Sequence, residues 1–203
     1  MGQILAHSID TFITLGVPED NVWCIGHSLG AQVCGFAGKL SLNSIGRITG
    51  LDPAHPSFDS KTPRYRLNAN DAKNVDIIHT GGNRGGRSII NDYGTLLKIG
   101  DADFYPNGGL DQPGCSTLGN IDGCSHDRAY DLFTESVVSP LCIGGSFDNQ
   151  TCTIHRAVMG YAWSGLRGTF YLVTAGKSAY CLGDLGIMPV DPSLPDMRDI
   201  VSC

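Results

Sequence analysis

Nine residues near the amino terminus carry most of the information about the architecture: residues 22–30, Val-Trp-Cys-Ile-Gly-His-Ser-Leu-Gly. The first four are apolar and mostly β-branched or aromatic, which is typical of a short buried strand. Small and helix-forming residues follow Ser28 as far as Leu40, so we expect a helix over residues 29–40. A serine between Gly26 and Gly30 at a strand-to-helix turn is the pattern of a nucleophile elbow.

The chemistry of such an elbow explains the residue types. The serine takes strained backbone angles, and small neighbours let the strand and the helix approach each other. The amide N–H of Leu29, at the start of the helix, points to where an oxyanion would form. We therefore predict Ser28 as a nucleophile and Leu29 as an oxyanion-hole donor. The alternative is a glycine-rich helix start with a structural serine.

Further strands and helices alternate along the chain. Apolar segments rich in β-branched or aromatic residues predict strands at residues 22–25, 45–51, 75–79 and 169–174. Apolar residues at helical spacing predict a helix over residues 4–15 and another that begins just after His126. Residues 81–102 are expected to form a long loop, and residues 103–109 are rich in turn formers. This alternation predicts an α/β fold with a mostly parallel sheet.

Composition excludes several classes of protein. The 203 residues carry 14 Lys+Arg against 20 Asp+Glu, a net charge of −6, and 41% are hydrophobic. That length suits one domain. The chain has no basic cluster of the kind that nucleic-acid binding needs, and its apolar runs are too short to cross a membrane. We expect a monomer with no nucleic-acid partner and no transmembrane segment.

A serine nucleophile needs a histidine base that a carboxylate orients. In this architecture the chain order is serine, then Asp or Glu, then histidine. Asp52 closes the next predicted strand, and the carboxyl ends of parallel strands hold the functional side chains of open α/β sheets. Three competing carboxylates lie in a polar connection or at the wrong end of a strand: Asp59, Asp71 and Asp76. Asp52 is therefore preferred.

Six histidines are candidates for the base. Five precede the serine, follow Asp52 too closely, close a strand or lie in a late segment between cysteines: His7, His27, His55, His79 and His155. His126 follows Cys124 in a loop and leads into a helix, so it can reach across the edge of the sheet. The pattern alone favours His126 and leaves the others open.

The eight cysteines favour an oxidising compartment. Cys24 and Cys34 lie in apolar or small-residue contexts and are interpreted as buried thiols. The six from Cys115 onward lie in polar, loop-like contexts that suit disulfides. Asn149, in Asn-Gln-Thr, is an N-glycosylation acceptor. These features favour secretion, although residues 1–7 show no signal-peptide pattern.

Five segments occur together in the order found in one family: residues 26–31 (Gly-His-Ser-Leu-Gly-Ala), 45–54 (Ile-Gly-Arg-Ile-Thr-Gly-Leu-Asp-Pro-Ala), 75–80 (Val-Asp-Ile-Ile-His-Thr), 103–109 (Asp-Phe-Tyr-Pro-Asn-Gly-Gly) and 124–129 (Cys-Ser-His-Asp-Arg-Ala). On these residues the chain resembles the pancreatic-lipase family of animal lipases and phospholipases A1, most closely its arthropod members without a C-terminal lipid-binding domain. The resemblance covers nearly the whole chain. It implies an α/β-hydrolase fold with Ser28 as nucleophile, Asp52 as acid and His126 as base.

The resemblance also bears on the substrate. It implies that Cys115 and Cys124 pair and bracket a lid, and we favour Cys142–Cys152 as a second disulfide. Only residues 116–123 lie in the lid, where triglyceride lipases of the family carry a much longer helical one. A short lid accompanies phospholipase A1 activity in this family. We expect a secreted carboxylic ester hydrolase acting on phospholipid or glyceride at a lipid–water interface, with phospholipase A1 first and triacylglycerol lipase second. A non-catalytic, yolk-protein-like lipid binder is the alternative of another class.

The resemblance raises the question of a structural calcium, which pancreatic lipases hold in the segment matching residues 63–71. Calcium takes about 6–8 oxygen ligands, several of them from carboxylates. Pro63 and Arg66 have backbone carbonyls to offer and Asp71 a carboxylate, but Asn68 stands where the family often has a second acid. We expect no required cofactor, with a structural calcium as the weaker alternative.

The start of the chain carries a last expectation. Hydrolases of this fold take a second oxyanion donor from a loop upstream of the nucleophile, but the residues before Ser28 hold only one predicted helix and one strand. We therefore expect residues 1–203 to be a lipase domain that lacks its N-terminal strands, with Met1 an internal methionine of a longer protein. Such a chain would be poorly folded or weakly active by itself.

Overall fold

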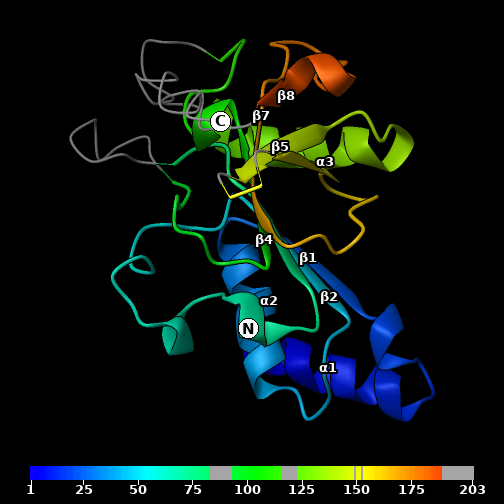
Figure 1. The fold of residues 1–203 in the computed structure, drawn as a ribbon. Helices are drawn as coiled ribbons and strands as arrows, with labels where there is room; N and C mark the ends of the chain where they lie inside the picture. Colours follow the sequence, from blue (N-terminus) through cyan, green and yellow to red (C-terminus); the bar gives the residue numbers. More distant parts are fainter. Residues whose placement is uncertain (83–92, 116–122, 149, 152, 189–203) are drawn as a thin grey trace.

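A mixed β-sheet with helices on both faces forms the frame of the protein (Figure 1). The computed structural model describes residues 1–82, 93–115, 123–148, 150–151 and 153–188. The helices are α1 (Gly2–Thr14), α2 (Leu29–Leu40) and α3 (Cys124–Val138). The strands are β1 (Trp23–His27), β2 (Arg47–Leu51), β3 (Val75–Ile78), β4 (Ala102–Pro106), β5 (Ile143–Asp148), β6 (Thr153–Val158), β7 (Gly168–Leu172) and β8 (Ile187–Met188).

The sheet is parallel over most of its width. Its strand order is β1-β2-β3-β4-β7-β5-β6, with β8 paired to β7. Strands β1 to β4 and then β7 are joined by parallel pairings, whereas β5 runs antiparallel to both β6 and β7. This arrangement confirms the predicted α/β fold with a mostly parallel sheet.

Two apolar cores lie on opposite faces of this sheet. Successive residues of a strand point to opposite faces, and Ile77 accordingly joins the core under α1 and α2 while Ile78 joins the core under α3. Every residue of β3 and of β4 is buried, as expected for central strands covered on both sides. Figure 1 shows α1 and α2 together in the lower part of the view and α3 in the upper part.

Some elements differ from the sequence-based expectation. Residues 102–106, placed in the expected loop and turns, form β4. The polar Asp103 is not typical of a buried strand. Its carboxylate is buried here because the backbone N–H groups of Ile99 and Gly100 donate to it and His79 contacts it. The helix expected after His126 begins earlier, at Cys124, so that His126 lies in its first turn. The hairpin of β5 and β6 was not predicted.

Three disulfides join described cysteines. The expected Cys115–Cys124 bond is present. The favoured Cys142–Cys152 bond is wrong, because Cys142 pairs with Cys181 and so joins the start of β5 to the segment after β7. Cys24 and Cys34 are not free thiols: they form a disulfide that ties β1 to α2.

Strand β1, which leads to Ser28, lies at the edge of the described sheet. Among the described residues it pairs with β2 alone, and Ile25 in its middle is 45% exposed. Within the described ranges, no helix has the length and apolar character needed to cross a membrane.

A buried ion pair joins the amino ends of the central strands. The guanidinium of Arg47 donates to both carboxylate oxygens of Asp76, at 2.8 and 3.0 Å, and to the carbonyl of Gly160 at 2.6 Å. Thr49 donates to the same carboxylate, and the ring of Trp23 lies 4.1 Å from the guanidinium. Burial raises the pKa of Asp76, and the Arg47 guanidinium opposes that shift. Asp76, near the amino end of β3, is thus a structural residue, whereas Asp52 follows the carboxyl end of β2.

Removing the cation of this pair should destabilise the fold. We expect Arg47→Met to lower the free energy of unfolding by about 3–5 kcal/mol, because it leaves a fully buried carboxylate unpaired. Arg156→Met is the control, since the Arg156–Asp184 pair is solvent-exposed and should add little. Equilibrium denaturation in urea measures both, and equal losses in the two variants would contradict a special role for Arg47.

Candidate active site

Ser28 is the single residue between β1 and α2. Its backbone angles are φ 56° and ψ −120°, a strained conformation for a residue with a side chain. It occupies the N-cap position of α2, yet its hydroxyl makes no capping hydrogen bond, although serine is a preferred capping residue. The turn therefore displays the hydroxyl instead of using it to satisfy the helix, and Leu29 begins the helix as predicted.

The two glycines around Ser28 have different roles. A Cβ on Gly26 would overlap the carbonyl of Gly30 and lie 2.6 Å from the nitrogen of Ala31, so no larger residue fits between β1 and the first turn of α2. A Cβ on Gly30 would meet none of the described atoms within 4 Å. The close approach expected at both glycines is thus confirmed at Gly26 alone.

Asp52 lies beside Ser28 because β1 and β2 are parallel neighbours. His27 pairs with Leu51, and the Ser28 N–H donates to the Leu51 carbonyl at 2.9 Å, so the residues that follow the two strands are adjacent. The Asp52 side chain is fully buried. One carboxylate oxygen accepts the backbone N–H of Thr80 at 2.8 Å, and the other lies 2.6 Å from Nδ1 of His126.

His126 is the histidine that meets Asp52. With its Nδ1 bound to the carboxylate, its other ring nitrogen is left to accept a proton from a hydroxyl, which is the arrangement of a general base. Three other histidines are placed elsewhere. His79 is buried between the Thr95 carbonyl and Asp103, and His55 pairs with Asp59 on the surface. The side chain of His155 is 55% exposed on β6.

Two glycines that the sequence did not single out lie close to the Asp52 side chain. A Cβ on Gly94 would overlap the Asp52 carboxylate. A Cβ on Gly81 would lie 2.9 Å from that carboxylate and 2.9 Å from the backbone nitrogen of His126. Both belong to the long segment after β3, which the sequence predicts only as a loop. Because their effect depends on three segments meeting in space, only the structure identifies them.

His27, also unassigned from the sequence, contacts His126 from the strand side. Its Nε2 lies 3.0 Å from the backbone oxygen of His126, and the two rings are 4.4 Å apart between centroids. Since His27 directly precedes Ser28, this contact brings the serine turn and the first turn of α3 together. Tyr130 packs edge-on against His27, and the neighbouring charge of Asp127 raises the pKa of its phenol.

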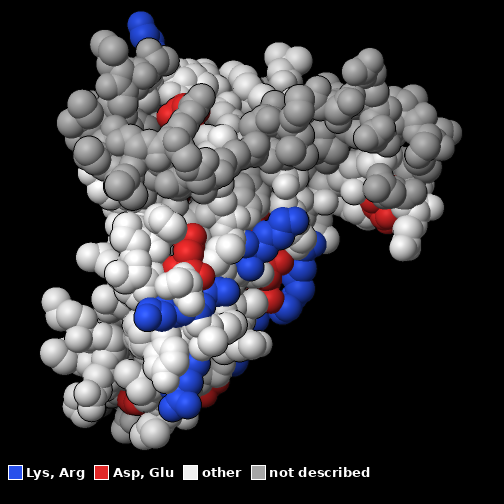
Figure 2. Space-filling model, turned by 90° about the vertical axis from the view of Figure 1, so that its left-hand side faces the viewer, with Lys and Arg blue, Asp and Glu red and all other residues white. Residues whose placement is uncertain are grey.

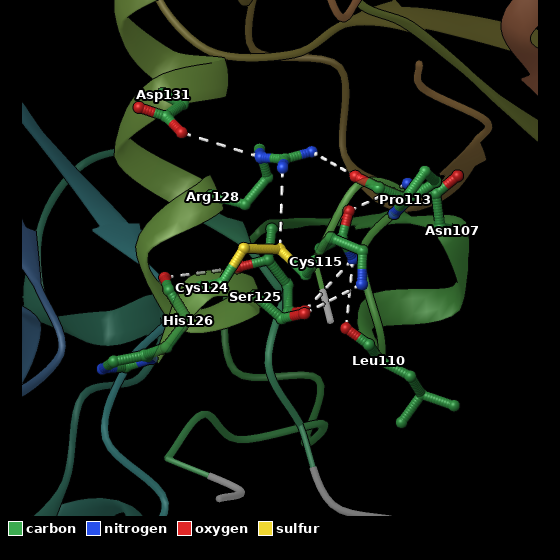
Figure 3. The surroundings of a disulfide bond; sticks show 11 residues. Asn107, Leu110, Pro113, Cys115, Cys124, Ser125, His126, Arg128 and Asp131 are labelled. Atoms are coloured by element: carbon green, nitrogen blue, oxygen red, sulfur yellow. Dashed lines mark hydrogen bonds and ion pairs between the residues drawn. A yellow bond between two sulfur atoms is a disulfide. The ribbon is translucent and has the colours of Figure 1, made fainter. Parts of the chain in front are cut away.

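The Cys115–Cys124 disulfide fixes the start of the helix that carries His126 (Figure 3). The Arg128 guanidinium donates to the Pro113 carbonyl at 2.9 Å and reaches the sulfur of Cys115, so the segment before the disulfide is tied to α3. Figure 3 shows the His126 ring directed away from the disulfide. Residues 116–122 of the expected lid, and the predicted glycosylation site Asn149, lie outside the described residues.

The expected calcium segment lies against α2, and its residues do not fit calcium. The oxygens of Pro63, Arg66 and Asp71 all accept N–H groups, either from Asn68 or from the ammonium of Lys39. Burial lowers the pKa of Lys39 and raises that of Asp71, and their ion pair opposes both shifts. Within the described ranges, no group of three His, Cys, Asp or Glu residues could hold a metal ion.

Comparison with known proteins shows the family to which the chain belongs. The family described as Lipase matches residues 1–178. The chain is 43% identical over 141 residues to lipase member H-A of Xenopus laevis, 42% over 147 residues to pancreatic triacylglycerol lipase of Mus musculus, and 38% over 178 residues to phospholipase A1 2 of Vespa affinis. These matches cover 68%, 64% and 81% of this chain, but only 29%, 31% and 51% of the relatives.

The difference between the two glycines of the elbow can be measured. We expect Gly26→Ala to lower the free energy of unfolding by at least about 2 kcal/mol, because the added methyl group overlaps the backbone of α2. The matched Gly30→Ala should leave stability unchanged or slightly higher, since alanine favours the helix. Equilibrium unfolding followed by circular dichroism distinguishes the two. A tolerated Gly26→Ala would contradict the close approach of β1 and α2.

Proposed function

The chain belongs to the lipase family, and on that premise we propose that it is a serine carboxylic ester hydrolase that acts on lipids. The observation that carries the proposal is the contact of 2.6 Å between Asp52 Oδ2 and His126 Nδ1. It lies beside a strained strand-to-helix turn whose serine does not cap the helix with its hydroxyl. A serine that only began a helix would be expected to cap it. A binding protein would not need a serine, a histidine and an acid together.

In the proposed reaction the Ser28 hydroxyl attacks the ester carbonyl carbon while His126 accepts its proton at Nε2. Asp52 keeps Nδ1 protonated and stabilises the imidazolium, and the Leu29 N–H, with the dipole of α2, stabilises the developing oxyanion. His126 then gives the proton to the leaving alcohol, so that an acyl group remains on Ser28. Water, activated by the same histidine, releases the fatty acid and restores the serine.

For the substrate we propose the sn-1 ester of a phospholipid, with triacylglycerol as the second choice. The relatives include a phospholipase A1 and a pancreatic triacylglycerol lipase, so the family alone does not choose between them. The short segment between Cys115 and Cys124 supports the phospholipase, since it leaves no room for a long apolar lid helix. The chemistry of the three residues requires no cofactor.

We further propose that the protein works outside the cell, at a lipid–water interface. Three disulfides among the described residues suit an oxidising compartment. On the face in Figure 2, basic and acidic side chains are interspersed, and the net charge is −6. Recognition through the acyl chains of a lipid suits such a surface better than recognition of a polyanion.

Two substitutions test the proposed roles of the acid and the nucleophile. Ser28→Ala should reduce ester hydrolysis to background. Asp52→Asn should lower kcat about 10⁴-fold, because an amide no longer fixes the required tautomer of the histidine. Asp59→Asn is the control, since Asp59 pairs with His55 at the surface and should leave kcat unchanged. Continued turnover by Ser28→Ala would overturn the proposal.

The substrate is tested by fatty-acid release from phosphatidylcholine vesicles and from a triacylglycerol emulsion, measured side by side. We expect release from phosphatidylcholine, with the fatty acid coming from the sn-1 position. Release from the triacylglycerol alone would overturn the phospholipase assignment. If the folded protein binds vesicles but hydrolyses neither lipid, it is a non-catalytic lipid binder.

A further inference from the structure

A partly buried ammonium group lies at the centre of residues 63–71, the segment in which the family resemblance implies a structural calcium. Lys39, in the last turn of α2, donates to the Arg66 carbonyl at 2.8 Å and forms an ion pair with the carboxylate of Asp71. The Lys39 side chain is 19% exposed and that of Asp71 only 2%. The positive charge therefore lies inside the contact between α2 and residues 63–71.

The amide of Asn68 donates to oxygens of the same segment. Its Nδ2 donates to Pro63 O at 3.0 Å, to Arg66 O at 3.4 Å and to Asp71 Oδ1 at 3.0 Å. Its backbone N–H donates to Asp71 Oδ2 at 2.9 Å. Every candidate ligand oxygen thus has a proton donor from Lys39 or Asn68.

The charges of the site agree with this assignment. A divalent cation needs several oxygens with carboxylates among them, and Asp71 is the one carboxylate here. The charge of Lys39 balances that of Asp71 at direct contact. A calcium ion would have to displace the ammonium and face it at close range, at a large electrostatic cost in a partly buried site.

The surface of α2 is shaped for this contact. A Cβ on Gly35 would lie 2.8 Å from Leu67 Cα and 3.0 Å from Asp71 Oδ2, and a Cβ on Gly38 would overlap the Asp71 carbonyl. These glycines bring the Asp71 backbone against the helix, within reach of Lys39. The same helix begins at Leu29, directly after Ser28, so the contact also fixes the position of the elbow.

We propose that the ammonium of Lys39 serves as a built-in cation in place of a structural calcium, so that the fold is stabilised without any metal. Lys39 joins the end of α2 to residues 63–71 as a bound ion would, by satisfying their carbonyl and carboxylate oxygens. Because the prediction concerns folding, its test does not depend on the proposed hydrolase activity.

The native protein gives the first test. After treatment with EDTA, we expect the same Tm in 5 mM CaCl₂ and in 5 mM EGTA, and no heat of calcium binding in isothermal titration. A saturable rise in Tm with calcium, with stoichiometric binding, would overturn the proposal.

Substitution of Lys39 gives the second test. Lys39→Met should lower Tm by about 5–10 °C, because it leaves the Asp71 carboxylate buried and unpaired. The matched control is Lys61→Met, since residue 61 is exposed, and its Tm should not change. Equal Tm values for native protein and Lys39→Met would overturn the proposal.

A double variant tests whether Lys39 occupies the position of the cation. Lys39→Ala with Asn68→Asp removes the ammonium and supplies the missing second carboxylate. We expect this variant to gain a saturable rise in Tm with CaCl₂ that MgCl₂ does not reproduce, since magnesium demands a tighter octahedral site. A double variant that is folded and indifferent to calcium would contradict the replacement.

Discussion

The contact between Gly26 and the first turn of α2 is the constraint on which the site depends. A side chain at Gly26 would overlap the backbone of that turn, so the strand passes into the helix with one intervening residue only because position 26 is glycine. Ser28 must then adopt the strained angles of the turn. Three contacts hold α2 in place: the Cys24–Cys34 disulfide to β1, the packing of α1, and the Lys39–Asp71 pair at its far end. Strain at Ser28 persists because these surroundings over-determine the turn.

The other two residues of the site reach Ser28 by different routes. Asp52 arrives through the sheet, since β1 and β2 are parallel and in register. His126 arrives through a helix whose start is fixed by the Cys115–Cys124 disulfide and by the contact of His27 with the His126 carbonyl. Glycine at position 94 leaves room for the Asp52 carboxylate beside them. The site is thus assembled from rigid elements, with loops closing around it.

Local sequence patterns predict only part of this arrangement. The strand and helix around Ser28 follow from apolar runs and small residues, and the closing position of Asp52 follows from strand order. What escaped prediction depends on partners distant in sequence. The polar Asp103 concealed β4 because one of its partners, His79, is a residue that only folding brings near. Cys142 pairs with Cys181 across the fold instead of with a near neighbour. Nothing in the pattern around Lys39 indicates that its charge meets Asp71.

In the proposed mechanism, Ser28 is a nucleophile activated by His126 and Asp52. The most direct measurement is mass-spectrometric mapping of a fluorophosphonate adduct on the folded, disulfide-intact protein, carried out in parallel on native protein and on His126→Gln. We expect a stoichiometric adduct on the peptide that contains Ser28 in the native protein, and a strongly reduced labelling rate in the variant. Folded protein that stays unmodified at Ser28, or labels equally fast without His126, would contradict it.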